Sequence, residues 1–183
     1  YWIDYLAGYA RPVSLPGKQP VGAAGTGAPA HHNLSFSVSL SEGLQELARL
    51  SGLTLNTVFQ GLWGLLLCRR LGLGDVVFAA TVSGRHGSLP DVEKLVGLCI
   101  NAVPVRVRVR EAEDFVAMCR RLQGEFGAGV GYHHYPLSDL QAESGWGGDL
   151  FDHILVFENY PVSVEGTAAL GLDVQLVHSF EKT

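Results

Sequence analysis

The chain has 183 residues, the length of one domain or of one lobe of a larger one. Hydrophobic residues make up 47% of it and charged residues 17%, against about 25% charged in an average soluble domain. The net charge is −5, and the 13 basic residues are scattered, so the clustered basic patch typical of nucleic-acid binding is missing from the sequence. A chain this apolar either encloses a large core or leaves a face that another part of a protein covers.

The first third of the chain predicts a short helix, a linker and a strand. Tyr1 to Gly8 carries apolar residues at helical spacing and fits the last turns of a helix. Arg11 to Pro29 holds four prolines and several glycines, which indicates an exposed linker. Leu34 to Leu40 alternates apolar residues with serines, the period of a half-buried strand.

Two helices are expected next. Ser41 can cap a helix that ends at Gly52, and Thr54 can cap the following one. The second helix is apolar on nearly all sides, with Val58, Leu62, Trp63, Leu66 and Leu67, so we expect it to be buried. Polar residues interrupt the uncharged stretch that contains it, which favours a core helix over a membrane span.

The second half predicts strands and short helices in alternation. Val76 to Val82 is a continuous apolar run, as in a central strand buried on both faces. Leu98 to Val109 contains a second strand, in which Pro104 indicates an edge position or a bulge. Arg106, Arg108 and Arg110 alternate with valines there and are expected on the solvent face of that strand. Two helices and two strands are expected farther on, at Asp114 to Phe126, Leu137 to Glu143, Ile154 to Phe157 and Leu172 to Val177.

Cysteines and histidines give no convincing metal site. Cys68, Cys99 and Cys119 are widely spaced and form no Cys-x-x-Cys pair, so reduced, buried thiols in a cytoplasmic protein are expected. His31-His32 and His133-His134 each lack a third ligand at a spacing that closes a zinc site. Structural roles are therefore favoured for both pairs, and His134 is expected to brace the Tyr-Pro-Leu turn that follows it. Neither glycine-rich stretch fits a dinucleotide fingerprint.

The stretch from Thr81 to Arg106 holds the candidate functional residues. Ser83-Gly84-Arg85 directly follows the buried strand, and strand ends in α/β folds tend to carry function. The guanidinium of Arg85 can lock a loop there. Asn101 lies within an apolar strand, where an unbonded carboxamide costs about 1–3 kcal/mol. Two roles stay open for Asn101: it pins the backbone of a neighbouring loop, or it contacts a substrate. We expect its side chain to bond the adjoining segment Ser83-Gly84-Arg85.

This stretch resembles a motif of a known family. Val96 to Arg106 (VGLCINAVPVR) is similar to the fifth core motif of the condensation domains of nonribosomal peptide synthetases, although Cys99 stands where the family usually has an aromatic residue and Ala102 where it often has threonine. Further segments resemble the family in its own order: Tyr1 to Gly8, Thr54 to Trp63, His134 to Gln141, and Phe151 to Pro161. The last one is similar to a phrase of condensation domains that take an L-configured donor.

The resemblance implies a fold and a chemistry. Members are α/β proteins with two chloramphenicol-acetyltransferase-like lobes, each a mixed sheet packed with helices in two layers, and a tunnel between the lobes. Peptidyl carrier protein domains deliver phosphopantetheine-tethered substrates, and the acceptor amine attacks the donor thioester to form a peptide bond. The family implies that this chain binds no cofactor directly and that an adenylation domain is a neighbour.

The resemblance also predicts how the chain is divided. Residues 1–10 would end a helix of the upstream lobe, residues 11–30 would form a linker, and residues 31–183 would form a second lobe that is incomplete at its C-terminus. In that lobe the residues expected to shape the tunnel wall are Ser83, Gly84, Arg85, Asn101, Arg106 and His134. The uncovered face of such a lobe is expected to make the isolated chain self-associate.

The family's catalytic signature, His-His-x-x-x-Asp-Gly, does not occur in this sequence. After His31-His32 the two last positions hold Phe36 and Ser37, and after His133-His134 they hold Ser138 and Asp139. In family order the signature belongs before Tyr1. We therefore expect no catalytic residue and no peptide-bond formation by this chain alone.

Two alternatives remain from the sequence. An epimerisation or heterocyclisation domain has the same fold, and the upstream signature would distinguish it. A non-catalytic module that docks carrier proteins is also compatible, and transfer of a labelled acyl group by the chain would exclude it.

Overall fold

A three-stranded mixed sheet organises the chain in the computed structural model, which describes residues 1–10, 14–15, 31–85, 91–145 and 150–158. The strands are β1 (Asp75–Val82), β2 (Asn101–Arg108) and β3 (Ile154–Leu155), in the order β2-β1-β3. β1 is antiparallel to β2 and parallel to β3. The central, buried strand expected at Val76 to Val82 is therefore confirmed.

β2 runs along one edge of the described sheet. Its residues pair with β1 without interruption, from Asp75 opposite Arg108 to Val82 opposite Asn101. Pro104 lies opposite Ala79 within this ladder. A proline cannot donate a hydrogen bond, so it is tolerated where its nitrogen faces away from the neighbouring strand. The edge position that Pro104 indicated is confirmed, and the unbroken register shows that no bulge forms.

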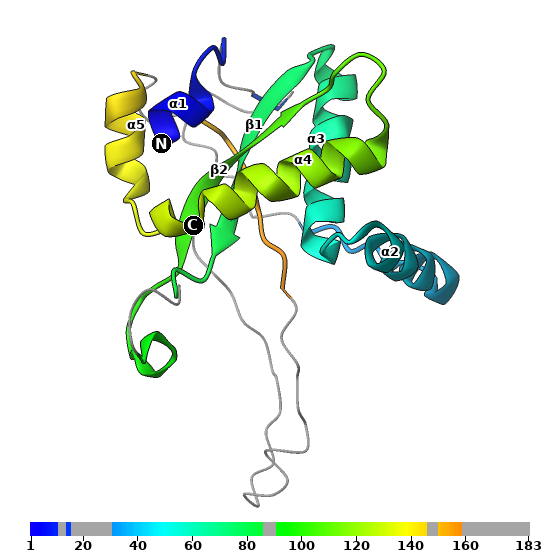
Figure 1. Ribbon diagram of the computed structural model, residues 1–183, viewed down its shortest axis with the longest axis horizontal. Coiled ribbons are helices and arrows are strands. Elements are labelled where there is room, and N and C mark those ends of the chain that lie inside the picture. Colours follow the sequence, from blue (N-terminus) through cyan, green and yellow to red (C-terminus); the bar gives the residue numbers. More distant parts are fainter. Residues whose placement is uncertain (11–13, 16–30, 86–90, 146–149, 159–183) are drawn as a thin grey trace, which may run out of the picture.

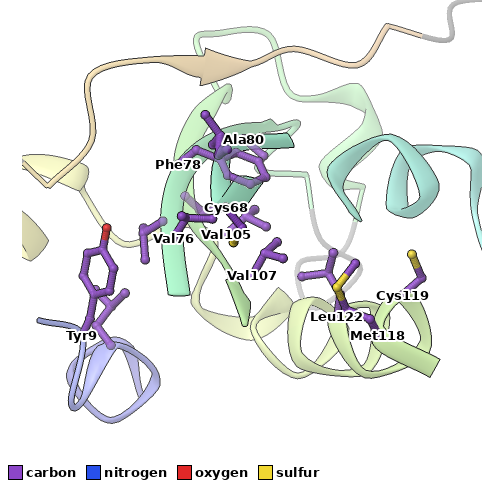
Figure 2. Packing of buried hydrophobic residues seen from close by; sticks show 14 of the residues in the cluster. Tyr9, Cys68, Val76, Phe78, Ala80, Val105, Val107, Met118, Cys119 and Leu122 are labelled. Carbon is purple, nitrogen blue, oxygen red and sulfur yellow. The ribbon is translucent and has the colours of Figure 1, made fainter. Parts of the chain in front are cut away.

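Two helices pack on one face of the sheet. They are α3 (Leu55–Leu71) and α4 (Phe115–Ala128), which also contact each other. Figure 2 shows Val105 and Val107 of β2 directed toward Leu122 and Met118 of α4, with Tyr9 on the opposite side of the strands. α3 comes so close to β2 that a side-chain carbon at Gly64 would lie 2.4 Å from Val107. Glycine at this position therefore sets the spacing between helix and sheet.

Side-chain caps begin both of these helices, and the one at Thr54 was expected. The hydroxyl of Thr54 accepts a hydrogen bond from the backbone nitrogen of Thr57 at 3.1 Å, and the carboxylate of Asp114 accepts one from Ala117 at 2.7 Å. α3 is less completely buried than its composition predicted, because the side chains of Leu62 and Leu66 are 39% and 49% exposed. In this respect the prediction of a helix buried all round was wrong.

Helices α1 (Trp2–Leu6) and α5 (Leu137–Ser144) contact each other at the flank of the strands (Figure 1). Trp2, Leu6 and Tyr9 belong to the same buried apolar cluster as the sheet. Two short 3-10 turns complete the described elements, η1 (Val92–Lys94) and η2 (Val130–Tyr132). The division of the chain at residues 10 and 30 stays a prediction.

Helix α2 (Val38–Ser51) replaces the strand predicted at Leu34 to Leu40. Its N-cap is Ser37, whose hydroxyl accepts a hydrogen bond from Leu40 at 3.2 Å, so Ser41 is not the cap. Residues 31–40 are all exposed, and none of the described strands pairs with them. An alternating segment needs a neighbouring strand to satisfy its backbone, whereas a helix satisfies its own. The strand prediction was therefore wrong.

No single helix in the described part of the chain is long and apolar enough to cross a membrane. α2 and α3 reach that length and composition only together, and they meet at a bend of 106°. The strand expected at Ile154 to Phe157 is present as β3, and the one expected at Leu172 to Val177 lies outside the described residues.

Two of the three cysteines are buried beneath the helices. Cys68 ends up against the sheet and Cys119 between α3 and α4, while Cys99 is partly exposed. Burial raises the pKa of both Cys68 and Cys119 to about 11, since a thiolate is poorly solvated there. Both thiols are therefore protonated and unreactive at neutral pH, as a structural role predicts.

Candidate functional site: a cleft at the end of strand β1

The segment that follows β1 is fixed by an arginine. The Nη1 atom of Arg85 donates hydrogen bonds to the carbonyl oxygens of Leu95, at 2.6 Å, and Val92, at 3.2 Å. Arg85 thereby ties the end of β1 to the loop that leads into β2, as its position predicted. Next to it, Gly84 has a φ of +64°, and a side-chain carbon there would lie 1.9 Å from the carbonyl oxygen of Cys99.

Asn101 holds the backbone of the turn at His133 to Tyr135, and not the segment at Ser83. Its Nδ2 atom donates to the carbonyl oxygens of His133 and Tyr135, both at 2.8 Å, and its Oδ1 accepts from the nitrogen of Ala102 at 2.9 Å. The expectation that Asn101 bonds Ser83 to Arg85 was wrong. Its backbone already pairs with Val82, and its amide turns to the loop after η2.

Removal of the Asn101 amide should destabilise the fold. We expect Asn101→Ala to lower the free energy of unfolding by about 1–3 kcal/mol, because two carbonyl groups lose their donor. Urea denaturation followed by circular dichroism measures this, with the exposed Ser138→Ala as the control. An Asn101→Ala chain that unfolds within about 0.5 kcal/mol of the parent, the range of ordinary surface changes, would contradict the role.

Arg106 is not on a solvent face. Its side chain is among the few buried charged groups, 4% exposed, and its guanidinium forms an ion pair with Asp75 at 2.6 Å. The remaining donors bind the carbonyl oxygens of Tyr5 and Ala7 at 2.9 and 2.8 Å. The prediction of a solvent face was wrong because helix α1 covers the strand there. The carboxylate of Asp75 raises the pKa of Arg106, so the charge persists in this setting.

Of the two adjacent histidines, His133 is the structural one. It is 2% exposed, and its ring lies against Phe126, with centroids 4.9 Å apart, and Trp2, with centroids 6.3 Å apart. His134 is exposed to solvent, so the bracing role expected of it falls to its neighbours. The turn is held through the carbonyl groups of His133 and Tyr135, which Asn101 binds.

A cleft of about 300 Å³ opens beside these residues. Its walls combine hydroxyl, amide and imidazole groups with apolar side chains, contributed by Asn56, Thr81, Val82, Ser83, Phe126, Val130 and His133. None of these residues carries a carboxylate, an ammonium or a guanidinium. A cleft of this kind suits a neutral ligand that offers amide or carbonyl groups and an apolar surface. Within the described ranges, no group of three or more His, Cys, Asp or Glu residues could hold a metal ion.

Comparison with known proteins decides the family. The family model described as "Condensation domain" matches residues 1–179. The chain belongs to the condensation-domain family. The membership that the motif at Val96 to Arg106 predicted is thus confirmed.

Relatives of this condensation-domain chain include long synthases. It is 34% identical over 189 residues to tyrocidine synthase 2 of Brevibacillus parabrevis, covering 100% of the chain and 5% of that protein. It is 34% identical over 194 residues to bacitracin synthase 3 of Bacillus licheniformis, covering 100% and 3%. The chain therefore corresponds to a small part of each of these relatives.

The fold also agrees with a solved condensation domain. A structure of the first condensation domain of the CDA synthetase matches with a TM-score of 0.68 and 22% identity, over 87% of this chain and 34% of that chain. The α/β class with a mixed sheet packed against helices is confirmed. The match leaves most of that solved condensation domain without a counterpart here.

The structure brings some of the predicted condensation-domain residues together and separates others. Ser83 lines the cleft, Gly84 and Arg85 follow it in the chain, and Asn101 holds the turn that carries one wall. Arg106 lies under α1. Sequence reasoning missed six lining residues: Asn56, Thr81, Val82, Phe126, Val130 and His133. The position of Thr81 and Val82 at the end of a buried strand was a usable signal, whereas the other four are distant from that strand in the sequence.

Proposed function

We propose that this chain forms one wall of the acyl-transfer tunnel in the condensation domain of a nonribosomal peptide synthetase. The observation that carries the proposal is the cleft at the C-terminal end of β1, which is neutral and partly apolar, and whose wall residue His133 is held through its carbonyl oxygen by Asn101 of the family's fifth motif. Carrier-tethered substrates contain amides and a thioester and would bind such a wall without a counter-charge.

In the proposed reaction, the acceptor's α-amine attacks the carbonyl carbon of the donor thioester. The new N–C bond forms, the C–S bond breaks, and the donor carrier's phosphopantetheine arm leaves as a thiol. Because an amine and a thioester are already reactive partners, positioning supplies much of the acceleration. The hydroxyl of Thr81 and the amide of Asn56 would orient the substrate, and Phe126 and Val130 would exclude water.

The groups that handle the proton belong, on this proposal, to a preceding lobe. This chain contains no His-His-x-x-x-Asp-Gly signature. The proposed partners are that lobe, peptidyl carrier protein domains and a neighbouring adenylation domain. Phosphopantetheine would enter as the arm of a carrier, and the site would lie in the cytoplasm, where carrier loading takes place.

Filling the cleft should block condensation. In a complete condensation domain carrying this sequence, we expect Ser83→Trp to lower dipeptide formation at least tenfold, because an indole occupies the space needed by the substrate, while Ser83→Ala keeps activity within about threefold. Dipeptide release from loaded donor and acceptor carriers, measured by mass spectrometry, gives the result.

The same assay tests whether the proton-handling groups lie outside this chain. The 183-residue chain, offered the same two carriers, should give no dipeptide above background. Turnover by this chain within tenfold of the complete domain would overturn the assignment of the proton-handling groups to another lobe. Full activity of Ser83→Trp would overturn the assignment of the cleft.

A further inference from the structure

Helix α1 is held firmly at its C-terminal end. It contains only five residues, far fewer than an isolated helix needs to be stable in water. Arg106 donates to the carbonyl oxygens of Tyr5 and Ala7, and its backbone nitrogen donates to the hydroxyl of Tyr5 at 2.7 Å. Asp75 binds the other edge of the same guanidinium. One buried arginine therefore holds the C-terminal end of α1 in place.

The N-terminal end of α1 lies against the turn that carries a cleft residue. The indole nitrogen of Trp2 donates to the carbonyl oxygen of Tyr132 at 3.2 Å. Tyr1 stacks on the ring of Tyr132, with centroids 4.5 Å apart, and its hydroxyl donates to the carbonyl oxygen of Glu125 at 3.0 Å. Gly129 makes room for this contact, since a side-chain carbon there would lie 2.9 Å from the Tyr1 hydroxyl.

Trp2 thus lies behind the wall of the cleft. Its ring is nearly parallel to that of His133, at an interplanar angle of 14°, and on another side His133 meets Phe126. Both His133 and Phe126 line the cleft, whereas neither Trp2 nor Arg106 is among the lining residues. A displacement of α1 would remove the support of His133 from behind, while Asn101 would still hold the backbone of the turn.

We infer that Trp2 and Arg106 are positioning residues for the reaction of this site: Arg106 fixes α1, and α1, through Trp2, fixes the His133 wall of the cleft. The inference rests on the proposed function, because it takes the cleft to hold the substrate. It also makes α1 the mechanical connection between the chain that precedes it and the cleft. Neither residue touches the substrate.

The link between Arg106 and His133 can be tested in the 183-residue chain, without catalysis. NMR of isotope-labelled tryptophan and histidine should show a nuclear Overhauser effect between the rings of Trp2 and His133, which Arg106→Met abolishes. Arg121→Met is the matched control. Arg121 is also mostly buried and paired, with Glu113 at 2.7 Å, but contacts no α1 carbonyl group. An unchanged nuclear Overhauser effect between Trp2 and His133 in the Arg106→Met chain would overturn the inference.

The consequence for catalysis is tested in the complete domain. Trp2→Leu should lower kcat roughly tenfold while KM for each carrier stays within twofold, since a displacement of 1 Å at a reacting group can cost about 100-fold. Trp2→Phe, which keeps a ring behind His133, should recover most of the loss. Gly72→Ala supplies a destabilised control, because its φ of +66° strains any residue with a side-chain carbon, while the added carbon meets nothing within 4 Å. We expect that control to keep its kcat.

The outcomes separate the two proposals. If Ser83→Trp blocks condensation but Trp2→Leu does not lower kcat, the positioning role is overturned and the cleft assignment stands. If Gly72→Ala loses kcat as Trp2→Leu does, the effect is general destabilisation and the positioning role is again overturned. If Ser83→Trp leaves condensation intact, the proposed function fails, and the catalytic role of α1 fails with it, although the NMR link to His133 survives.

Discussion

Gly84→Ala is expected to lower the free energy of unfolding by about 2–5 kcal/mol. The backbone at Gly84 has a φ of +64°, which costs about 1–2 kcal/mol for a residue with a side-chain carbon. That carbon would also lie 1.9 Å from the carbonyl oxygen of Cys99, and relief of such crowding costs about 1–3 kcal/mol more. Thermal and urea denaturation of the purified chain measure the loss.

Gly72→Ala separates the two contributions. Gly72 has a φ of +66°, almost the same as Gly84, but a carbon added there would meet nothing within 4 Å. It should therefore show only the conformational cost, about 1–2 kcal/mol. Equal losses for the two variants would contradict the close approach between Gly84 and Cys99. The result bears on the site, because this contact and Arg85 together fix the segment that directly follows the cleft residue Ser83.

The second large effect concerns self-association of the isolated chain. The loop before β2 exposes four large apolar side chains, and two of them, Val96 and Leu98, are 99% and 92% exposed. Arg85 holds this loop at the carbonyl group of Leu95, so it presents a fixed apolar surface. Sedimentation velocity at rising concentration should show dimers or larger species. The double variant Val96→Glu, Leu98→Glu should weaken this association at least tenfold, because like charges would meet at the contact.

Val109→Glu is the control for this experiment. Val109 is also an exposed apolar residue, but it follows the far end of β2. It should leave the association unchanged. A parent chain that stays monomeric at every concentration and binds no hydrophobic dye would contradict the prediction and indicate a domain that needs no covering lobe.

Local signals in the sequence predicted local structure well. Thr54 was recognised as a helix cap because threonine before a run of helix-forming apolar residues is a typical N-terminal signal, whereas the cap at Asp114 was not singled out. β1 was recognised because an uninterrupted run of apolar, β-branched residues of this length is typical of a buried strand. The stretch from Thr81 to Arg106, which the sequence indicated as the candidate region, contains Ser83, which lines the cleft, and Asn101, which supports it.

Contacts between distant residues could not be predicted in the same way. The alternation around Arg106 showed only that its neighbours share a face, and gave no indication that α1 covers it. The carboxamide of Asn101 indicated a buried partner but not its identity, which is 32 positions away at His133. Leu34 to Leu40 failed for a related reason: its alternation indicates a strand only where another strand is available to pair with it.

The contact between Arg106 and α1 also determines when α1 can pack during synthesis of the chain. Arg106 and Tyr5 are 101 positions apart in the sequence. At a synthesis rate of about 5–20 residues per second, α1 leaves the ribosome roughly 5–20 s before the residue that fixes it. During that interval Trp2, Leu6 and Tyr9, all buried in the finished fold, have no sheet to cover. These side chains therefore stay exposed longer during synthesis than those of elements whose partners are close in the sequence.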